Sequence, residues 1–355
     1  MKNVVFLLIF AAAAAANPIY TVADLGVIDG SATGYAINSS GTVVGWAQNP
    51  SGGQQAFVST ANGLQALSAG PYESYAYGIN DAGTIAGTTY DANGQAHATI
   101  WSATGSPTVL AAGSYATAIN NAGVVVGGNG EAFAVVNGQI QSLATVPGVN
   151  WSAAYGLNNT GTIVGDGQLA NGTFRGMVWN PDGSVTQLGT FGGTSSQATG
   201  VNDSGEVVGF ASLSDGYQNA FAEIGGTMID LGTLGGGSSY AYGINDSGEI
   251  VGYSWLADGG QSAFLYDDGT MLDLNALLVG NSGWDLLQAY GINNSGQITG
   301  VGLYDGQLSA FVLTDPPAAA AVDIAGVPEP SGLLMSCAAL AMIAFFRSRL
   351  WAQGE

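Results

Sequence analysis

Residues 244–252 read INDSGEIVG, and residues 79–87 read INDAGTIAG. The shared pattern is an aliphatic residue, Asn, two small or polar residues, Gly, and a β-branched pair closed by Gly. It occurs seven times, and its anchoring asparagines, 38 to 48 residues apart, are Asn38, Asn80, Asn120, Asn158, Asn202, Asn245 and Asn293. A period of this length predicts a stack of small units, because each unit can bury its apolar face only against its neighbours.

Each repeat contains four short segments that are typical of β-strands. The Asn-x-x-Gly step between the first two reads as a tight turn, because Asn bonds its own main chain and Gly adopts positive φ without a steric clash. A third strand is built on Ala-Phe or an equivalent, as at residues 220–222, and a fourth is clearest at residues 228–231 and 271–274. Four short strands with a turn about every ten residues predict one antiparallel blade.

The number of strands predicts how the structure closes. First, second and third strands each occur seven times, whereas only six fourth strands follow them. The missing fourth strand lies ahead of the first repeat, where residues 20–25 read YTVADL and resemble residues 229–232. The sequence therefore predicts an all-β, seven-bladed β-propeller closed by its N-terminal strand, which leaves no long unpaired sheet edge. A parallel β-helix is the alternative, although its rungs usually need fewer residues than these repeats.

Composition excludes several classes of function. The 355 residues carry a formal net charge of −21, and between residues 17 and 330 only Arg175 is basic apart from one histidine. Such a domain repels phosphate backbones, so nucleic-acid binding is excluded. The single cysteine, Cys337, rules out a disulfide within the chain and a cysteine-based metal site.

The N-terminal segment predicts export. Residues 1–16 begin with Lys2, continue in an apolar run over residues 4–16, and end in small residues before Asn17. This is the pattern of a cleaved secretory signal peptide; a transmembrane helix is the alternative, but the run of 13 residues is short for one. The repeat domain then covers residues 17–315, and a Pro/Ala-rich linker covers residues 316–326.

The repeats resemble a known family. Residues 230–236, 241–252 and 263–266 together form a unit similar to the HAF repeat of bacterial extracellular proteins, and the likeness extends over residues 20–314. The position of the family's histidine is filled by Gln55, His97, Glu131, Asn219, Ser262 and Ser309. The resemblance implies an extracellular protein with no defined activity, so no function is assigned to His97.

The C-terminal segment, residues 327–355, has three parts. A Val-Pro-Glu-Pro motif is followed by the apolar run 332–346 and by a basic stop, Arg347 and Arg349. Fifteen residues rise about 22 Å as a helix, so flanking residues must extend the predicted transmembrane span towards the ~30 Å hydrocarbon core. The basic residues place the C-terminus in the cytoplasm and the repeats outside.

This tail resembles the PEP-CTERM sorting signal. The residues that match its motif are Val327, Pro328, Glu329 and Pro330. The resemblance implies that an integral-membrane exosortase cuts near the motif and passes the protein from the membrane to the cell surface or to exopolysaccharide. A plain C-terminal membrane anchor is the alternative.

The sequence supplies no defensible catalytic arrangement, and we predict neither a catalytic residue nor a metal or cofactor. A triad or a phosphate site would rest on His97 or Arg175 alone. We expect His97 to be packed or at the rim, and Arg175 to pair with a nearby carboxylate. Asp267 and Asp268 could serve a glycosidase, but in so acidic a chain close carboxylates arise by chance.

The loops between second and third strands carry aromatic residues beside amide or acid groups, and the aromatic residues are Trp46, Tyr90, Trp255 and Tyr304. Flat rings with short polar neighbours suit sugar or peptide binding, although exposed loops of any propeller resemble these. The prediction is an exported structural or binding protein of the cell surface or extracellular matrix, with exopolysaccharide as a candidate partner and no enzyme activity. An extracellular polysaccharide-active enzyme is the alternative.

Overall fold

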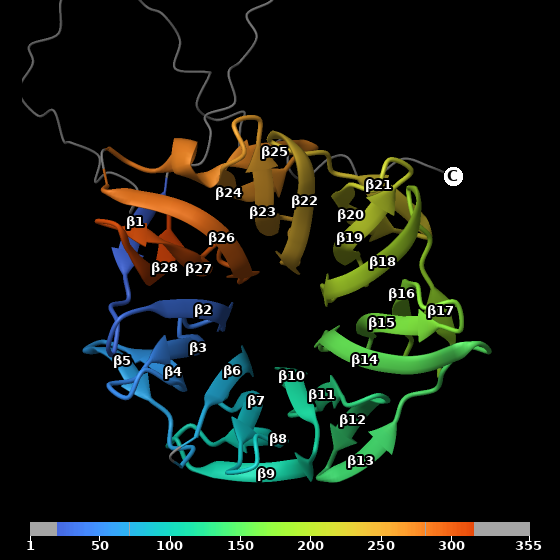
Figure 1. Ribbon diagram of the computed structural model, residues 1–355, viewed down its shortest axis with the longest axis horizontal. Coiled ribbons are helices and arrows are strands. Elements are labelled where there is room, and N and C mark those ends of the chain that lie inside the picture. Colours follow the sequence, from blue (N-terminus) through green and yellow to red (C-terminus); the bar gives the residue numbers. More distant parts are fainter. Residues whose placement is uncertain (1–19, 71, 281, 316–355) are drawn as a thin grey trace, which may run out of the picture. The chain divides into compact units, whose positions relative to one another are not determined.

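Seven four-stranded antiparallel sheets are arranged around a common centre in this computed structural model (Figure 1). The structure describes residues 20–70, 72–280 and 282–315. In each sheet the strand order follows the chain outward from the centre, apart from the sheet that β1 completes. The predicted all-β, seven-bladed propeller is therefore confirmed.

The strands of each blade are named here by their order from the centre. The first strands are β2 (Ala32–Ile37), β6 (Ser74–Ile79), β10 (Tyr115–Ile119), β14 (Val149–Leu157), β18 (Gly192–Val201), β22 (Gly235–Ile244) and β26 (Trp284–Ile292). The second strands are β3 (Val43–Gln48), β7 (Ile85–Tyr90), β11 (Val125–Gly128), β15 (Ile163–Leu169), β19 (Val207–Leu213), β23 (Ile250–Leu256) and β27 (Ile298–Tyr304).

The outer half of each blade is built in the same way. The third strands are β4 (Gln54–Thr60), β8 (Ala96–Trp101), β12 (Ala132–Val136), β16 (Phe174–Trp179), β20 (Gln218–Ile224), β24 (Gln261–Asp267) and β28 (Gln307–Thr314). The fourth strands are β5 (Gly63–Ala66), β9 (Pro107–Ala112), β13 (Gln139–Ser142), β17 (Val185–Gln187), β21 (Thr227–Asp230), β25 (Thr270–Asp273) and, for the last blade, β1 (Thr21–Asp24). A 3-10 helix, η1 (Leu274–Leu277), follows β25.

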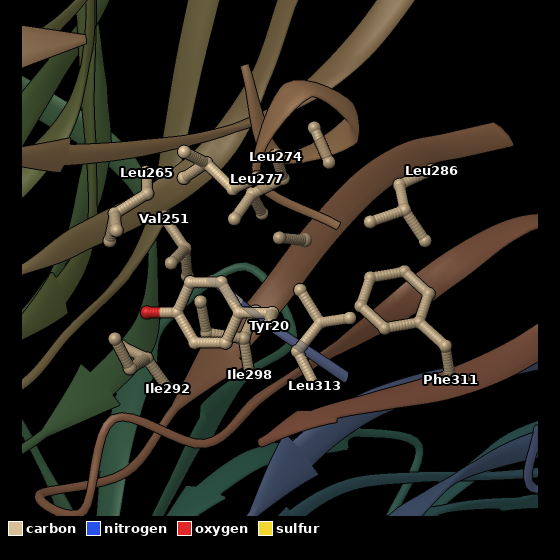
Figure 2. Packing of buried hydrophobic residues seen from close by; sticks show 12 residues of the cluster. Tyr20, Val251, Leu265, Leu274, Leu277, Leu286, Ile292, Ile298, Phe311 and Leu313 are labelled. Atoms are coloured by element: carbon tan, nitrogen blue, oxygen red, sulfur yellow. The ribbon is translucent and has the colours of Figure 1, made fainter. Parts of the chain in front are cut away.

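The N-terminal strand completes the last blade. β1 pairs with β28 in antiparallel register, with Thr21 opposite Thr314, so the sheet order is β1-β28-β27-β26. Tyr20, just ahead of β1, is 2% exposed and lies among buried side chains of the last two blades, including Leu274 and Leu313 (Figure 2). Its backbone also bonds the residues around the end of η1, donating to the carbonyl of Leu277. First and last segments of the described chain are thus held in one core.

The hydrophobic core lies between neighbouring blades. Phe221 of β20, at the Ala-Phe position of its repeat, is fully buried in one cluster with Val164 and Val178 of the preceding blade. Burying such a side chain stabilises the fold by about 1.5–3 kcal/mol relative to leaving it exposed. Most of the repeats place a buried phenylalanine at this position. Because each core cluster combines side chains of two blades, a single repeat has no core of its own, and neighbouring blades stabilise one another.

The predicted signal peptide (1–16), linker (316–326), sorting motif and transmembrane segment (332–346) lie outside the described residues. Within the described part of the chain, no helix has the length and apolar character needed to span a membrane.

Candidate functional site

Every first strand has a bulged residue at the same place, three positions before its repeat asparagine. In the blade of β14, pairing with β15 skips from Ala154 to Gly156, so Tyr155 has no partner on β15. A bulge of this kind redirects the side chain of the extra residue. The same skip occurs in all seven sheets, and the bulged residues are Tyr35, Tyr77, Thr117, Tyr155, Thr199, Tyr242 and Tyr290.

The glycine that closes each nine-residue motif makes room for this bulge. A Cβ added at Gly165 would overlap the carbonyl oxygen of Ala153, and one at Gly252 would overlap that of Tyr240. Only glycine allows the second strand to approach the first so closely. The motif that identifies the repeat is therefore also the feature that positions the bulged side chain.

All seven bulged residues, which we call the bulge ring, line one cavity of about 550 Å³. Four of its tyrosines form a continuous arc over adjacent blades. The ring centroids of Tyr35 and Tyr77 are 5.4 Å apart, those of Tyr35 and Tyr290 are 5.1 Å apart, and those of Tyr242 and Tyr290 are 5.1 Å apart. Such tilted and edge-to-face contacts hold the aromatic wall in a defined shape.

The two threonines of the bulge ring widen the cavity on the side away from this arc of tyrosines. Thr117 Oγ1 donates towards the carbonyl of Ala154 in the next blade at 2.8 Å, and Thr199 Oγ1 does the same to Ala241 at 2.8 Å. Because these hydroxyls are bonded to backbone, they leave the space that a tyrosine ring would fill. Trp151 and Gln197 complete the wall there.

The tyrosines of the bulge ring are neutral hydrogen-bonding groups. Burial raises the pKa of Tyr35, Tyr77, Tyr155, Tyr242 and Tyr290 above the usual value of their hydroxyls. The cavity thus combines flat apolar faces with uncharged hydroxyl groups, a surface that suits a polyhydroxylated ligand.

A second cavity, of about 420 Å³, shares Trp151, Tyr155 and Gln197 with the first. It contains Asp166 of β15, which is 3% exposed. Asp166 Oδ2 accepts a hydrogen bond of 2.7 Å from Gln197 Nε2, whereas Oδ1 has no hydrogen-bond partner among the residues that the structure describes. Burial raises the pKa of Asp166 to about 6, although the bond from Gln197 and the nearby hydroxyl of Tyr155 act in the opposite direction.

Asp166 is a residue that the sequence interpretation missed, although the repeat alignment contains a signal for it. It directly follows the closing glycine of its motif, where the other repeats carry Trp46, Thr88, Gly128, Phe210, Tyr253 and Val301. An acid at a position that is otherwise apolar or small marks the fourth repeat as different from the rest.

The repeat asparagines and the residues beside them line a third pocket, of about 270 Å³, to which every blade contributes. Each Asn donates its side-chain amide to the backbone carbonyl of the Asn in the next blade, at 2.8 to 3.2 Å, and the circle closes from Asn293 to Asn38 at 2.9 Å. The asparagines are also buried, at 3% to 6% exposure. We call this the asparagine ring, and it joins all seven blades through side chains that the sequence assigns only to local turns.

The next residue of each repeat forms a more exposed circle around the asparagine ring. The Asp203 amide, for example, donates to Asp246 Oδ1 at 2.8 Å, and the Asn294 side chain donates to Asp246 Oδ2 at 2.6 Å. These carboxylates are used by neighbouring amides. Among the described residues, no group of three or more His, Cys, Asp or Glu side chains is placed to hold a metal ion.

The four aromatic residues selected from the sequence lie at the ends of second strands instead of in the loops. Trp46 lies in β3, Tyr90 ends β7, Trp255 lies near the end of β23, and Tyr304 ends β27. The prediction of loop positions was wrong because the hairpins after these strands are tight, as the bond from Asn49 N to the Gly53 carbonyl illustrates.

These residues differ in their relation to the cavity. Trp46 Nε1 donates to the hydroxyl of Tyr35 at 3.2 Å, which connects it to the bulge ring. Tyr90 contacts Tyr75, whose ring stacks on that of Tyr77. Trp255 and Tyr304 are each 37% exposed, and neither lines the two cavities described above.

The residues considered for catalysis do not come together. His97 Nε2 lies 3.6 Å from the Asp91 carboxylate at a partly exposed position. Contrary to the prediction, Arg175 pairs with no carboxylate of the described residues, and its Nη1 donates instead to the backbone carbonyls of Phe174 and Thr194. Asp267 ends β24, and Asp268 adopts a positive φ of 46° in the turn that follows.

Comparisons with known proteins identify a fold and no family. No protein-family model matches the chain, and no curated protein matches its sequence. Among solved structures, a puromycin-hydrolysing peptidase of Mycobacterium tuberculosis matches at 12% identity and a TM-score of 0.55, over 84% of this chain and 55% of the peptidase.

Two further solved structures show weaker similarity. A putative TolB of Agrobacterium tumefaciens matches at 12% identity and a TM-score of 0.47, over 84% of this chain and 98% of its own. A gluconolactonase of Xanthomonas campestris matches at 13% identity and a TM-score of 0.42, over 70% of this chain and 91% of its own. The similarity to the peptidase, at 12% identity, shows the fold alone.

Proposed function

We propose that this protein is an exported binding protein of the cell surface or extracellular matrix, and that its propeller holds a segment of polysaccharide in the cavity lined by the bulge ring. The observation that carries the proposal is the convergence of one bulged side chain from each of the seven blades on a single cavity. Export is supported by the predicted signal peptide and by the sorting motif at residues 327–330.

The chemistry of the cavity favours a sugar chain. Tyrosine rings offer flat apolar faces against which the C–H faces of a pyranose can stack, and their neutral hydroxyls bond sugar hydroxyls. Gln197 and Asp166 add an amide and a carboxylate on one side. A chain with a formal net charge of −21 repels polyanions, so we expect a neutral or cationic polysaccharide as the ligand.

The same cavities give less support to the alternative of a polysaccharide-active enzyme. Glycoside hydrolysis generally needs two carboxyl groups on opposite sides of the scissile bond, about 5 to 9.5 Å apart. Among the described residues that line the two cavities, Asp166 is the one carboxylate. Binding without cleavage is therefore the function that we propose.

The test uses the full chain, purified in a mild detergent because of its predicted apolar segments, and titrated calorimetrically with cellotetraose and with polysaccharide from the producing cells. Replacing Tyr77 or Tyr242 by Leu removes one aromatic face and keeps apolar volume, so we expect about a tenfold loss of affinity for each. Tyr217→Leu is the control, because Tyr217 is 55% exposed and does not line either cavity.

Unchanged affinity in a Tyr77→Leu, Tyr242→Leu double variant that keeps the wild-type melting temperature would contradict the proposal. New reducing ends in the polysaccharide after incubation would instead support the enzyme. Ala variants of Trp46, Tyr90, Trp255 and Tyr304 test whether bound sugar extends from the cavity onto the ends of the second strands.

A further inference from the structure

The side chains that line the second cavity are of the kinds that bind a positively charged group. Trp151, Phe174 and Phe210 contribute aromatic rings to it, and those of Trp151 and Phe174 meet edge to face with their centroids 6.0 Å apart. Aromatic faces attract cations through the quadrupole of the ring, most strongly where water is excluded. The remaining lining is polar and uncharged apart from Asp166.

Asp166 supplies a hydrogen-bond acceptor that none of the described residues uses. Its Oδ2 accepts a bond from Gln197, while its Oδ1 is buried and accepts none within the described part of the chain. A buried carboxylate oxygen without a donor is unfavourable in the free protein, and a ligand that brings a donor removes that penalty. The free oxygen therefore indicates where a donor group of the ligand belongs.

The local charge favours a cationic donor over a neutral one. Arg175 lies on β16 beside Phe174, but its Nη1 is bonded to the carbonyls of Phe174 and Thr194, and the described residues show no ion pair between Arg175 and Asp166. Within residues 20–70, 72–280 and 282–315, the negative charge of Asp166 thus has no counter-ion. A charge-assisted bond from an ammonium group to a carboxylate is stronger than a bond from a neutral hydroxyl.

We propose that this cavity binds the ammonium group of an amino sugar, with Asp166 Oδ1 as its acceptor and the rings of Trp151, Phe174 and Phe210 around it. The inference rests on the proposed function, because the adjoining cavity of the bulge ring would hold the sugar chain that carries this group. The ligand is then a polysaccharide that contains unacetylated amino sugars.

The ionisation of Asp166 gives the binding a pH dependence. Its carboxyl has a pKa of about 6 because of burial, so it is largely charged at neutral pH and protonated in mild acid. One other ionisable group lines the same cavity, Tyr155 on β14, whose pKa burial raises, whereas Arg175 on the neighbouring β16 is not part of the lining. Tyr155 stays neutral in this range, so the titration of Asp166 would weaken amine binding as the pH falls through about 6.

The experiment compares three β-1,4-linked tetrasaccharides that differ only at carbon 2. The glucosamine tetramer carries an amine there, cellotetraose a hydroxyl, and the N-acetylglucosamine tetramer an acetamide. Near pH 7 we expect the full chain in detergent to bind the glucosamine tetramer about tenfold more tightly than either of the others. In Asp166→Asn this preference should disappear, so that the variant binds the glucosamine tetramer no more tightly than it binds cellotetraose.

Asp215→Asn is the matched control, because it removes the same formal charge from an exposed loop of the next blade. It should keep the preference for the amine. Cellotetraose binding without a preference for glucosamine in the wild type, or a preference that persists in Asp166→Asn, would overturn this inference and leave the proposed function standing. Failure of all three tetramers and of the native polysaccharide to bind would overturn both.

Discussion

The substitution Asp166→Asn should stabilise the protein at neutral pH. Asp166 is 3% exposed, and burial raises its pKa from 3.8 to about 6, against the smaller opposing effects of Gln197 and Tyr155. This difference in pKa corresponds to about 3 kcal/mol between the charged and the neutral carboxyl in the folded state. Asparagine has nearly the same shape, can still accept the bond from Gln197, and carries no charge.

The sign follows from proton binding. The folded state binds the proton of Asp166 more tightly than the unfolded state, so the neutral carboxyl contributes its full stability below about pH 3.8, and that contribution is lost as the pH rises through about 6. At pH 7 the free energy of unfolding of Asp166→Asn should exceed that of the wild type by up to about 3 kcal/mol. Near pH 4 the difference should shrink to about 0.5 kcal/mol.

Urea unfolding followed by tryptophan fluorescence at pH 7 and at pH 4 measures this difference. Asp215→Asn, at an exposed position, should change the midpoint little at either pH. If Asp166→Asn changed the free energy of unfolding by the same amount at both pH values, the reasoning would be refuted. A lower free energy of unfolding at pH 7 than in the wild type would refute it as well. A gain at pH 7 would mean that the wild type keeps a destabilising carboxylate, as ligand sites commonly do.

Three other perturbations test the architecture and the sorting tail. Asn202→Ala should lower the free energy of unfolding by about 2–4 kcal/mol, because it leaves buried backbone groups of the asparagine ring without partners; a melting temperature equal to that of the wild type would contradict this role. Deletion of residues 20–25 should lower the melting temperature far more than deletion of the exposed loop 214–217, since the first deletion removes Tyr20 and β1 from the last blade; equal melting temperatures would count against closure by this strand. Glu329→Ala or Pro330→Ala should leave uncut precursor in the membrane fraction, as an immunoblot would show, whereas normal release of both variants would leave only a simple anchor.

The sequence alone was sufficient for the blade, the number of blades and the strand that closes the last one. The turn at each Asn-x-x-Gly step, the alternating strands and the Ala-Phe strand are local features, and local features repeated seven times can be counted. The candidate binding site was harder to predict from the sequence. Tyr occupies the position three residues before the asparagine in five of the seven repeats, but the sequence does not show that this residue is the bulged one.

What the tertiary structure decided was the direction of side chains and the pairing of distant ones. A bulge shifts the alternation of a strand by one residue, so the face on which Tyr155 or Tyr242 lies cannot be read from the alternation alone. The contact between Asp166 and Gln197 joins two blades and residues 31 positions apart. The asparagine ring likewise ends in a bond between residues 255 positions apart. Such contacts depend on the closure of the whole circle, and no single repeat contains the information that fixes them.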